Sequence, residues 1–418
     1  MLNRRQILRG AGGGALLAGT GTLAGLLPPR LAGAATGGLD LPAALPEGTR
    51  EEAVLEALPG KAPLIKLSYR PPNYETPVSY FDRSVFTPNE AFFVRYHLAD
   101  IPEVDAKAWT LKIGGAAATA PLELTLDRLK QEFEPVEVAA VCMCSGNRRG
   151  LFQPHVPGVQ WGNGAIGNAR WKGARLRDIL NKAGVGKGAV EVAVNAADGP
   201  VLDKTPDFAK SLPVWKALDE TVIVAYEMNG APLPHWNGFP ARLIVPGWTA
   251  TYWVKHLTAI DALDRPFDGF WMKSAYRIPQ GKFPIVQRFT SQEYDAATTP
   301  ITEMVVNSMI TAPSTGAAKL PAGQPAEVRG FAWDGGYGIR TVEVSADGGK
   351  SWKDAALGQD SGRFSFRPWS FRFTPKAGRY EVIARATNRI GQTQTAELIL
   401  NPAGYHNNVM PRVTVTVA

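Results

Sequence analysis

The only two cysteines of the 418-residue chain, Cys142 and Cys144, lie one residue apart, and Arg148 and Arg149 follow within five positions of the second. A thiolate is a soft ligand for a transition metal, and nearby cations lower the thiol pKa. Arginine adds a permanently charged, planar group that suits oxyanions. The intervening Ser-Gly-Asn sequence is typical of a tight turn. These residue types alone indicate a metal-ligating thiolate beside an anion site.

Packing is the competing interpretation of both cysteines, because most free cysteines are small buried core residues. A disulfide between Cys142 and Cys144 would be badly strained across a single intervening residue, so we expect none.

The segments that must position these cysteines alternate between strand and helix patterns. Runs rich in β-branched and aromatic residues predict strands, and apolar periodicity predicts helices. Thr125 is suited to cap one of the helices. Strands are expected at Phe92–Tyr96, Trp109–Ile113, Val136–Met143 and Val190–Asn195, and helices near Glu51–Leu58 and at Leu126–Phe133 and Arg175–Lys182.

After residue 299 the pattern changes to short alternating segments separated by turn residues. The sequence Asp-Gly-Gly-Lys at 347–350 is a strong hairpin signal. Regular short strands of this kind are typical of an immunoglobulin-like β-sandwich. The expected strands are Ala326–Trp333, Arg340–Ser345, Ser370–Phe373, Tyr380–Thr387 and Thr393–Leu400.

The first 34 residues have the pattern of an export signal. The twin arginine Arg4-Arg5 precedes a Gly-, Ala- and Leu-rich run, and Ala32-Gly33-Ala34 offers a small-residue cleavage site. The run is too weakly apolar to favour a membrane span, and we expect none in the mature chain. Twin-arginine signals serve proteins that are exported already folded, so we expect a periplasmic protein.

A length of 418 residues exceeds the usual size of a single core and favours two domains, and 45% hydrophobic and 20% charged residues are ordinary for a globular protein. Four arginines of the signal segment make up more than half of the formal net charge of +7, so nucleic-acid binding has little support. No Cys-x-x-Cys-His sequence occurs, so we expect no c-type haem in this chain.

The sequence Cys-Ser-Gly-Asn-Arg-Arg at 144–149 resembles the Cys-Ala-Gly-Asn-Arg-Arg signature of the sulfite oxidase family of molybdenum enzymes. The resemblance continues through the segments 158–161, 164–167 and 169–176. In that family the signature cysteine binds molybdenum, which the dithiolene of molybdopterin also holds. Position assigns that role to Cys144 and leaves Cys142 as a packing residue.

The resemblance also implies a substrate pocket. Phe-Val-Arg-Tyr-His at 93–97 is similar to the family's Phe-Val-Arg-Asn-His, in which the arginine lines the oxyanion pocket and the histidine contacts the cofactor region. We therefore assign Arg95 and His97 to the pocket and Phe93 to cofactor binding. Alignment with the family motif assigns Arg149, rather than Arg148, to the oxyanion site. The same alignment places Tyr276 over the pocket and Trp161 in its wall.

The pterin-binding segment of the family resembles Asn-Gly-Phe-Pro-Ala-Arg-Leu-Ile-Val-Pro-Gly at 237–247, followed by Tyr-Trp-Val-Lys at 252–255. The residues this implies for cofactor binding are Asn237, Arg242, Trp253 and Lys255, with Asp198 added by its spacing. A buried phosphate needs such fixed cations and free backbone N–H groups. Vertebrate members carry histidine where this chain has Asn237.

The C-terminal tail departs from the vertebrate pattern, in which an arginine supplies a third cation to the anion pocket. Alignment on Gly404 places Ala403 at that position, so either the pocket has two arginines or His406 or another side chain substitutes. The tail is more similar to that of the sulfane dehydrogenases, the branch of the family that works in thiosulfate oxidation.

Taken with the residue patterns, the resemblance implies an α+β fold: a sulfite-oxidase-type mixed molybdopterin domain followed by an immunoglobulin-like β-sandwich domain. We expect an export signal at 1–34, an extended N-terminal arm at 35–88, the molybdopterin-binding catalytic domain at 89–299 and the β-sandwich domain, of the dimerisation type, at 300–418.

The expected activity is oxidation of sulfite to sulfate at a molybdenum–molybdopterin centre, with electrons passed to a separate c-type cytochrome and a homodimer implied by the second domain. Three alternatives stay open: a sulfane dehydrogenase, a reductase of an S-oxide or nitrate on the same scaffold, and a cofactor-free exported binding protein.

Overall fold

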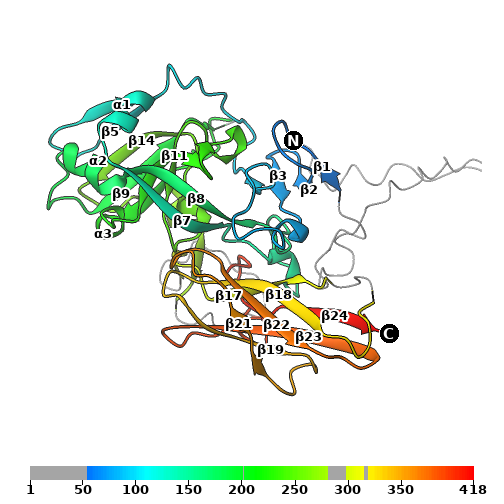
Figure 1. Cartoon of the computed structure of the whole chain (residues 1–418). Helices are drawn as coiled ribbons and strands as arrows, with labels where there is room; N and C mark the ends of the chain where they lie inside the picture. Colours follow the sequence, from blue (N-terminus) through cyan, green and yellow to red (C-terminus); the bar gives the residue numbers. More distant parts are fainter. Residues whose placement is uncertain (1–53, 201, 281–297, 315–318) are drawn as a thin grey trace, which may run out of the picture. The chain divides into compact units, whose positions relative to one another are not determined.

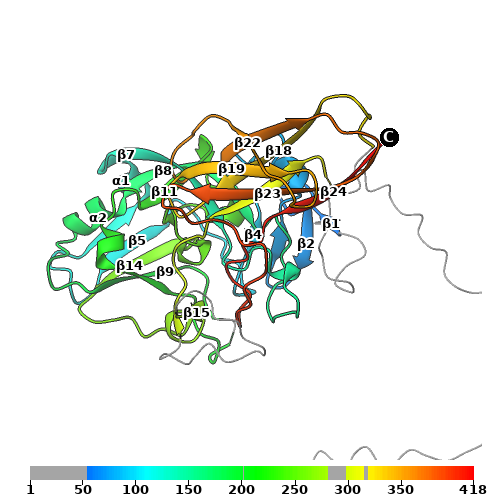
Figure 2. The same cartoon turned by 90° about the horizontal axis from the view of Figure 1, so that it is seen from below.

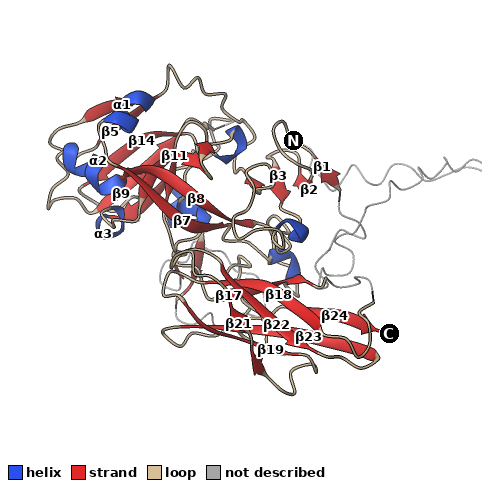
Figure 3. Cartoon of the chain, in the orientation of Figure 1, coloured by secondary structure: helices blue, strands red, loops and turns tan. Residues whose placement is uncertain are grey.

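Hydrogen-bonded strands make up most of the regular structure in the computed structural model, which describes residues 54–200, 202–280, 298–314 and 319–418 (Figures 1 and 3). The expected export signal at 1–34 and the first part of the N-terminal arm lie outside these residues. The α-helices of the described ranges are short: α1 (Leu126–Gln131), α2 (Leu176–Lys182), α3 (Val214–Ala217) and α4 (Phe270–Lys273). No helix in them is long and apolar enough to cross a membrane.

The described part of the N-terminal arm forms a sheet with the strand that carries Arg95. Its four strands are β1 (Leu55–Glu56), β2 (Leu64–Ser68), β3 (Asn73–Glu75) and β4 (Val94–Arg95), in that order. The helix expected near Glu51–Leu58 is wrong over its described residues, because Leu55 and Glu56 pair with β2 instead. The Glu56 carboxylate also accepts hydrogen bonds from Lys66 on β2 and Tyr74 on β3.

The described residues before 277 are called the first region, and two five-stranded sheets form its body (Figures 1 and 2). The first is mixed, since only the β14–β5 pair is parallel. Its order is β10 (Lys210–Pro213), β9 (Glu191–Ala196), β14 (Leu257–Leu263), β5 (Thr110–Gly114) and β6 (Leu122–Thr125). The second contains β12 (Ala231–Pro232), β11 (Ile223–Met228), β8 (Ile166–Arg175) and β7 (Pro135–Met143), with β13 (Arg242–Ile244) paired to β11.

Strand β7 delivers the cysteines. It pairs antiparallel with β8 along its whole length, from Pro135 opposite Ala174 to Met143 opposite Ile166. Its first residues alternate in exposure, but its last four are all buried, so the strand runs from the sheet surface into the core. The predicted strand at Val136–Met143 is therefore confirmed.

The helix predictions of this region are also close. The helix predicted at Leu126–Phe133 is α1, and the Thr125 hydroxyl accepts a hydrogen bond from the Arg128 backbone N–H, as an N-cap does. The helix predicted at Arg175–Lys182 is α2. A small antiparallel pair of strands, β15 (Arg277–Pro279) and β16 (Thr298–Pro300), follows the first region.

The C-terminal region contains two antiparallel four-stranded sheets, drawn from yellow to red in Figure 1. One consists of β17 (Asn307–Ala312), β18 (Ala326–Trp333), β22 (Arg367–Phe373) and β21 (Ala356–Leu357). The other consists of β20 (Lys353–Asp354), β19 (Ile339–Ser345), β23 (Gly378–Asn388) and β24 (Arg412–Val417). Side chains from both sheets share one hydrophobic core that includes Val328, Val342, Trp369 and Val382. The immunoglobulin-like assignment stays a prediction.

Within these sheets the strand expected at Thr393–Leu400 is wrong. Thr393 and Thr395 form only isolated bridges, to Thr387 and Val409. The alternating pattern misleads because Gln394 is buried for its amide, which bonds to Ser308, Asn307 and the Ala386 backbone N–H. The hairpin predicted at 347–350 is confirmed, since it joins β19 to β20.

Candidate active site

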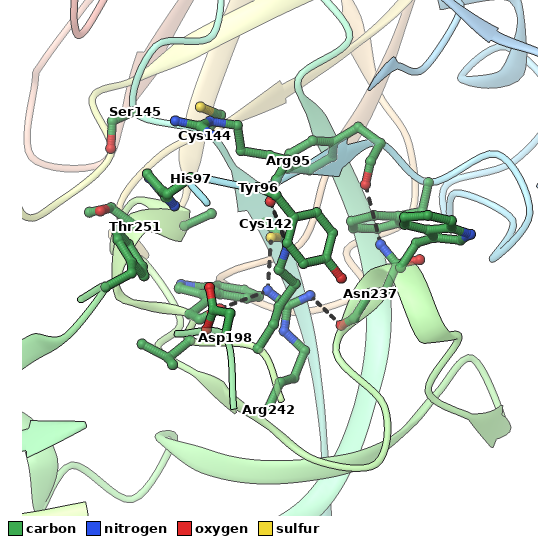
Figure 4. A pocket seen from close by; sticks show the side chains of 18 of the residues that line it. Arg95, Tyr96, His97, Cys142, Cys144, Ser145, Asp198, Asn237, Arg242 and Thr251 are labelled. Carbon is green, nitrogen blue, oxygen red and sulfur yellow. Dashed lines mark hydrogen bonds between the residues drawn. The ribbon is translucent and has the colours of Figure 1, made fainter. Parts of the chain in front are cut away.

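A cavity opens beside the end of β7 and brings together residues from the whole first region (Figure 4). Cys144 and Ser145 lie at one end of it in Figure 4, and Arg242, Asp198 and Asn237 lie at the other. Of the residues expected in the site, its lining includes Phe93, Arg95, His97, Cys144, Asp198, Asn237, Arg242, Trp253, Lys255 and Tyr276. Arg149 and Trp161 are not among the residues that line it.

Cys144 begins a tight turn in which backbone hydrogen bonds leave its thiol at the cavity wall. The carbonyl of Cys144 accepts from the Asn147 N–H at 2.9 Å, and its own N–H donates to the Ala165 carbonyl at 2.9 Å. Glycine two residues on leaves room for the Arg149 guanidinium, since a Cβ at Gly146 would lie 2.5 Å from it and would displace that side chain. The turn predicted from the Ser-Gly-Asn sequence thus places the guanidinium of Arg149 directly beneath it.

Cys142 is buried deeper and is not equivalent to Cys144. Burial raises the pKa of its thiol to about 11, although the nearby Arg242 opposes this increase. Its sulfur lies 3.9 Å from Nη2 of Arg242. Both cysteines are free, as expected from their spacing.

The two arginines of the signature point to different places. Arg149 donates from Nε to the Ala403 carbonyl at 2.8 Å and from Nη1 to the Val159 carbonyl at 3.0 Å. Its guanidinium carbon is 5.3 Å from the centre of the Tyr405 ring. Arg148 donates instead from Nη1 to Asn307 Oδ1 and to the Val409 carbonyl, each at 2.9 Å.

Arg95, His97 and Tyr276 meet on one side of the cavity. A hydrogen bond joins His97 Nε2 to the Tyr276 hydroxyl, and the pKa of His97 lies well below its ordinary value because of burial and then the charges of Arg95, Lys255 and Lys210. His97 is therefore neutral near pH 7. Burial raises the pKa of Tyr276, and Arg95 opposes that increase, so Tyr276 keeps its proton as a hydrogen-bond donor.

The C-terminal tail lies against this side of the site. The Tyr405 ring stacks on Tyr276 at 5.8 Å between centres, and the Ala403 carbonyl holds Arg149. Burial lowers the pKa of His406 to about 4, so this imidazole supplies no positive charge at neutral pH. In place of an arginine side chain, position 403 therefore contributes a backbone carbonyl that fixes Arg149.

At the other end, Arg242 is buried between two tryptophan rings. Its guanidinium carbon lies 5.1 Å from the Trp171 centre and 5.9 Å from the Trp253 centre. Nη1 donates to the Asn237 carbonyl at 2.9 Å and Nη2 to the Trp253 carbonyl at 3.0 Å. Burial lowers the pKa of Arg242, because backbone carbonyls do not neutralise a cation.

Lys255 lies next to Arg242 and is also poorly compensated. Its Nζ donates to the Arg95 carbonyl at 2.5 Å and lies 3.0 Å from the centre of the Tyr96 ring. Burial, and then the charge of Arg242, depress the pKa of Lys255 well below its ordinary value. Asp198 is the one carboxylate among the described lining residues, and burial raises its pKa to about 6, although Lys255 opposes that rise.

These charges show what kind of group the cavity fits. Among the described residues Arg95, Arg242 and Lys255 line it against a single carboxylate, so the cavity is electropositive. Several buried polar atoms of its lining have no hydrogen-bond partner within the described ranges: Arg95 Nη1, Ser145 Oγ, Arg242 Nε and Thr251 Oγ1. Buried polar groups are normally paired, so these atoms suit an anionic, hydrogen-bonding cofactor.

A metal at Cys144 would need ligands from such a cofactor. The described residues contain no group of three or more His, Cys, Asp or Glu side chains that could hold a metal ion. A single soft thiolate fits a metal whose remaining ligands are supplied from outside the protein, as the dithiolene of a molybdopterin supplies them. The donor set and the electropositive cavity therefore both fit molybdenum–molybdopterin.

Some lining residues were not predicted from the sequence. Tyr96, Phe208 and Thr251 line the cavity, and Phe208 stacks on His97 at 3.7 Å between ring centres. Tyr96 lies between two residues that were predicted, so the motif itself could have indicated it. Phe208 stands in a segment without a motif, and only its long-range contact reveals it.

Comparisons with known proteins agree with this geometry. The family described as "Oxidoreductase molybdopterin binding domain" matches residues 97–271, and the "Mo-co oxidoreductase dimerisation domain" matches residues 298–418. The mitochondrial sulfite oxidase of Macaca fascicularis is 35% identical over 377 residues, which cover 86% of this chain and 67% of that protein. The sulfite oxidase of Gallus gallus is 35% identical over 77% of this chain and 70% of its own length.

Two further relatives are more distant. The NAD(P)H nitrate reductase of Hordeum vulgare is 30% identical over 88% of this chain and 44% of its own length. The sulfane dehydrogenase SoxCD from Paracoccus pantotrophus shares the fold, with a TM-score of 0.71 over 84% of this chain and 88% of that chain, at 24% identity.

Fold and site together define a molybdopterin oxidoreductase with a sulfite-oxidase-type fold and a dimerisation-type second region. The chain belongs to the sulfite oxidase family.

Proposed function

We propose that this protein oxidises sulfite to sulfate at a molybdenum–molybdopterin centre bound in the cavity. The observation that carries the proposal is the cavity itself, which has the Cys144 thiol at one end and is lined by three cations but only one carboxylate among the described residues. The identity to sulfite oxidases across both regions supports this substrate class.

Bound in this cavity, the cofactor would supply the two-electron redox chemistry, and the protein would bind and orient the reactants. Cys144 is the residue that would hold the metal, and Arg242 and Lys255 would hold the anionic end of the pterin. Both cations are fixed by backbone carbonyls and aromatic rings, so little side-chain entropy is lost when an anion binds.

The anionic substrate would be oriented by the opposite wall. Arg95 keeps a buried Nη1 without a partner in the described ranges, which makes this N–H available to a sulfite oxygen. Tyr276 presents a protonated hydroxyl, and neutral His97 fixes its direction. Arg149 does not line the cavity but lies beneath Tyr405, so it would act through the local positive field.

We also propose a periplasmic location, a separate c-type cytochrome as electron acceptor and a homodimeric assembly. The twin-arginine sequence at Arg4-Arg5 supports export of a protein that folds around its cofactor before transport. The dimerisation-type region at 298–418 supports the homodimer.

A second candidate is a sulfane dehydrogenase acting on carrier-bound sulfur. The tail favours it, because Ala403 contributes only its backbone and Tyr405 stacks over Tyr276, which leaves the anion pocket one cation short of the vertebrate pattern. The Hordeum vulgare nitrate reductase keeps a third candidate open, in which this scaffold works as a reductase of nitrate or, by extension, of an S-oxide.

The test is turnover by purified protein that contains molybdenum, with sulfite as donor and either ferricyanide or cytochrome c as acceptor. Rapid reduction of both supports a cytochrome-coupled sulfite dehydrogenase, whereas reduction of oxygen alone would contradict the cytochrome proposal. Slow sulfite turnover beside fast turnover of a carrier-linked persulfide would replace the proposal with the second candidate. Fast nitrate or S-oxide reduction would replace it with the third.

A further inference from the structure

Lys61 is a buried lysine in the loop that joins β1 to β2 of the N-terminal sheet; no motif indicated it, and it lies outside both matched family domains. Its Nζ donates three hydrogen bonds: to the Asn89 carbonyl at 2.6 Å, to the Phe92 carbonyl at 3.0 Å and to Asn237 Oδ1 at 2.5 Å. An ammonium group has three N–H donors, so this environment satisfies the charged form completely.

Two of these three acceptors belong to residues that line the cavity, Phe92 and Asn237. The Lys61 bond also orients the Asn237 amide, since Oδ1 faces Lys61 and Nδ2 donates to the Phe93 carbonyl at 3.2 Å. Asn237 then accepts from Arg242 through its own carbonyl at 2.9 Å. A chain of contacts therefore connects Lys61 to the guanidinium at the cofactor end of the cavity.

The protonation of Lys61 depends on the charges at the cofactor end of the cavity. Burial lowers the pKa of Lys61 to about 7, while Glu90 opposes this decrease and Arg242 adds to it. An anion bound beside Arg242 would favour the ammonium form and its three hydrogen bonds. By linkage, a charged Lys61 would in turn favour the bound anion.

We propose that Lys61 is a positioning residue for the cofactor, which holds the Asn237 amide and the Phe92–Phe93 backbone in the arrangement that Arg242 needs to bind the cofactor's anionic end. This inference rests on the proposed function, because it assumes that molybdopterin occupies the cavity. It gives the N-terminal sheet a role in cofactor retention, and it explains how asparagine serves at position 237 of this chain.

The test compares Lys61→Met with Lys66→Met. Lys66 belongs to the same sheet but donates to Glu56 at 2.6 Å, away from the cavity, so it is a matched control. The full-length variants are prepared with cofactor and, from a cofactor-deficient host, without it. Thermal unfolding midpoints are measured for both forms, and cofactor release is followed by pterin fluorescence.

For Lys61→Met we expect a smaller difference between the midpoints of the loaded and cofactor-free forms, and cofactor release about ten- to a hundredfold faster, as for other residues that orient a ligand. Lys66→Met should leave both quantities unchanged. An equal decrease of both Lys61→Met midpoints with wild-type release would show that Lys61 is structural only, and would overturn the proposal.

If Lys61→Met does not fold, the wild-type protein provides the measurement. Reductive methylation of Lys61, followed by mass spectrometry, should be at least about tenfold slower in loaded than in cofactor-free protein, because opening of its hydrogen bonds would be coupled to cofactor loss. Equal rates would reject the inference. A wild-type protein that retains molybdopterin but does not oxidise sulfite would contradict the proposed function and leave the Lys61 result valid.

Discussion

The two ends of the cavity are built differently. At the cofactor end, Arg242 and Lys255 are held by backbone carbonyls of Asn237, Trp253 and Arg95, all within the first region. At the metal end, the turn that begins at Cys144 depends on residues more than 250 positions away, since Arg149 bonds to Ala403.

A buried polar network extends that dependence into the C-terminal region. Arg148, a non-glycine residue in the left-handed region at φ 66°, bonds to Asn307 and Val409, and Asn407 donates back to the Arg148 carbonyl at 3.1 Å. The difference between the ends teaches that the first region alone holds the residues of the cofactor end. The residues of the substrate side are held partly by the C-terminal tail, so changes in the tail sequence can alter them. The departure of this sequence at Ala403 lies in that tail.

The largest effect is expected at the metal end. Cys144→Ser should abolish turnover, because a hydroxyl is a poor soft-metal ligand. Cys142→Ser should keep most activity, since that thiol contacts Arg242 and stays protonated, with a pKa raised to about 11 by burial. Sulfite-dependent ferricyanide reduction measures both, normalised to molybdenum content. An essential Cys142 would show that the two thiols have been assigned the wrong way round.

At the cofactor end, Arg242→Met should weaken cofactor retention rather than turnover of the loaded fraction. Arg242 is buried, and each hydrogen bond it could make to an anion is worth about 1.5–3 kcal/mol, or about ten- to a hundredfold in affinity. Metal and pterin content after gel filtration check this. Full retention with slow turnover would instead place the anionic end of the pterin elsewhere.

At the metal end, substitution of the two neighbouring arginines should change different properties of the protein. Arg149→Met should raise the KM for sulfite by up to about tenfold, because a positive charge beside the pocket is lost. Arg148→Met should leave KM unchanged and lower the free energy of unfolding by about 1–3 kcal/mol, since it leaves buried carbonyl groups unpaired. Steady-state kinetics and denaturant unfolding distinguish them, and a KM effect confined to Arg148→Met would reverse the assignment.

Two segments of the C-terminal region show which elements the sequence pattern predicts and which it does not. Strand β18 was predicted at its observed bounds, Ala326–Trp333, because its burial alternates over the first five residues and the rest of the strand is buried and apolar. The pattern at Thr393–Leu400 failed because Gln394 is buried for its hydrogen bonds, and periodicity does not distinguish that from apolar burial.

For the site, motif residues such as Arg95, Cys144 and Lys255 could be predicted, since each belongs to a contiguous segment with its own chemistry. Lys61 could not, because its contact with Asn237 spans 176 positions and lies in a segment without a motif. Arg149 was expected in the pocket, but the tail that holds its guanidinium beside the pocket wall is visible only in three dimensions.

The smallest effect concerns one buried histidine near each end. His256, near the cofactor end, has its pKa lowered by burial to about 3, and His406, on the tail, to about 4. An unfolded histidine titrates near pH 6.5, so the unfolded state binds these protons first and stability falls as the pH drops below about 6.5. Above that pH neither histidine changes stability.

The histidine at the cofactor end has the lower of the two folded-state pKa values, so its effect should continue to lower pH. At pH 5 both folded imidazoles are still neutral, and each is expected to contribute about 2 kcal/mol of unfolding free energy relative to pH 7. His256→Gln and His406→Gln should therefore flatten the pH dependence between 7 and 5 about equally, and His256→Gln should flatten it more below about pH 4, as measured by denaturant unfolding of cofactor-free protein. A larger effect of His406→Gln below about pH 4 would mean that the tail, and not the cofactor end, sets the acid limit of the fold.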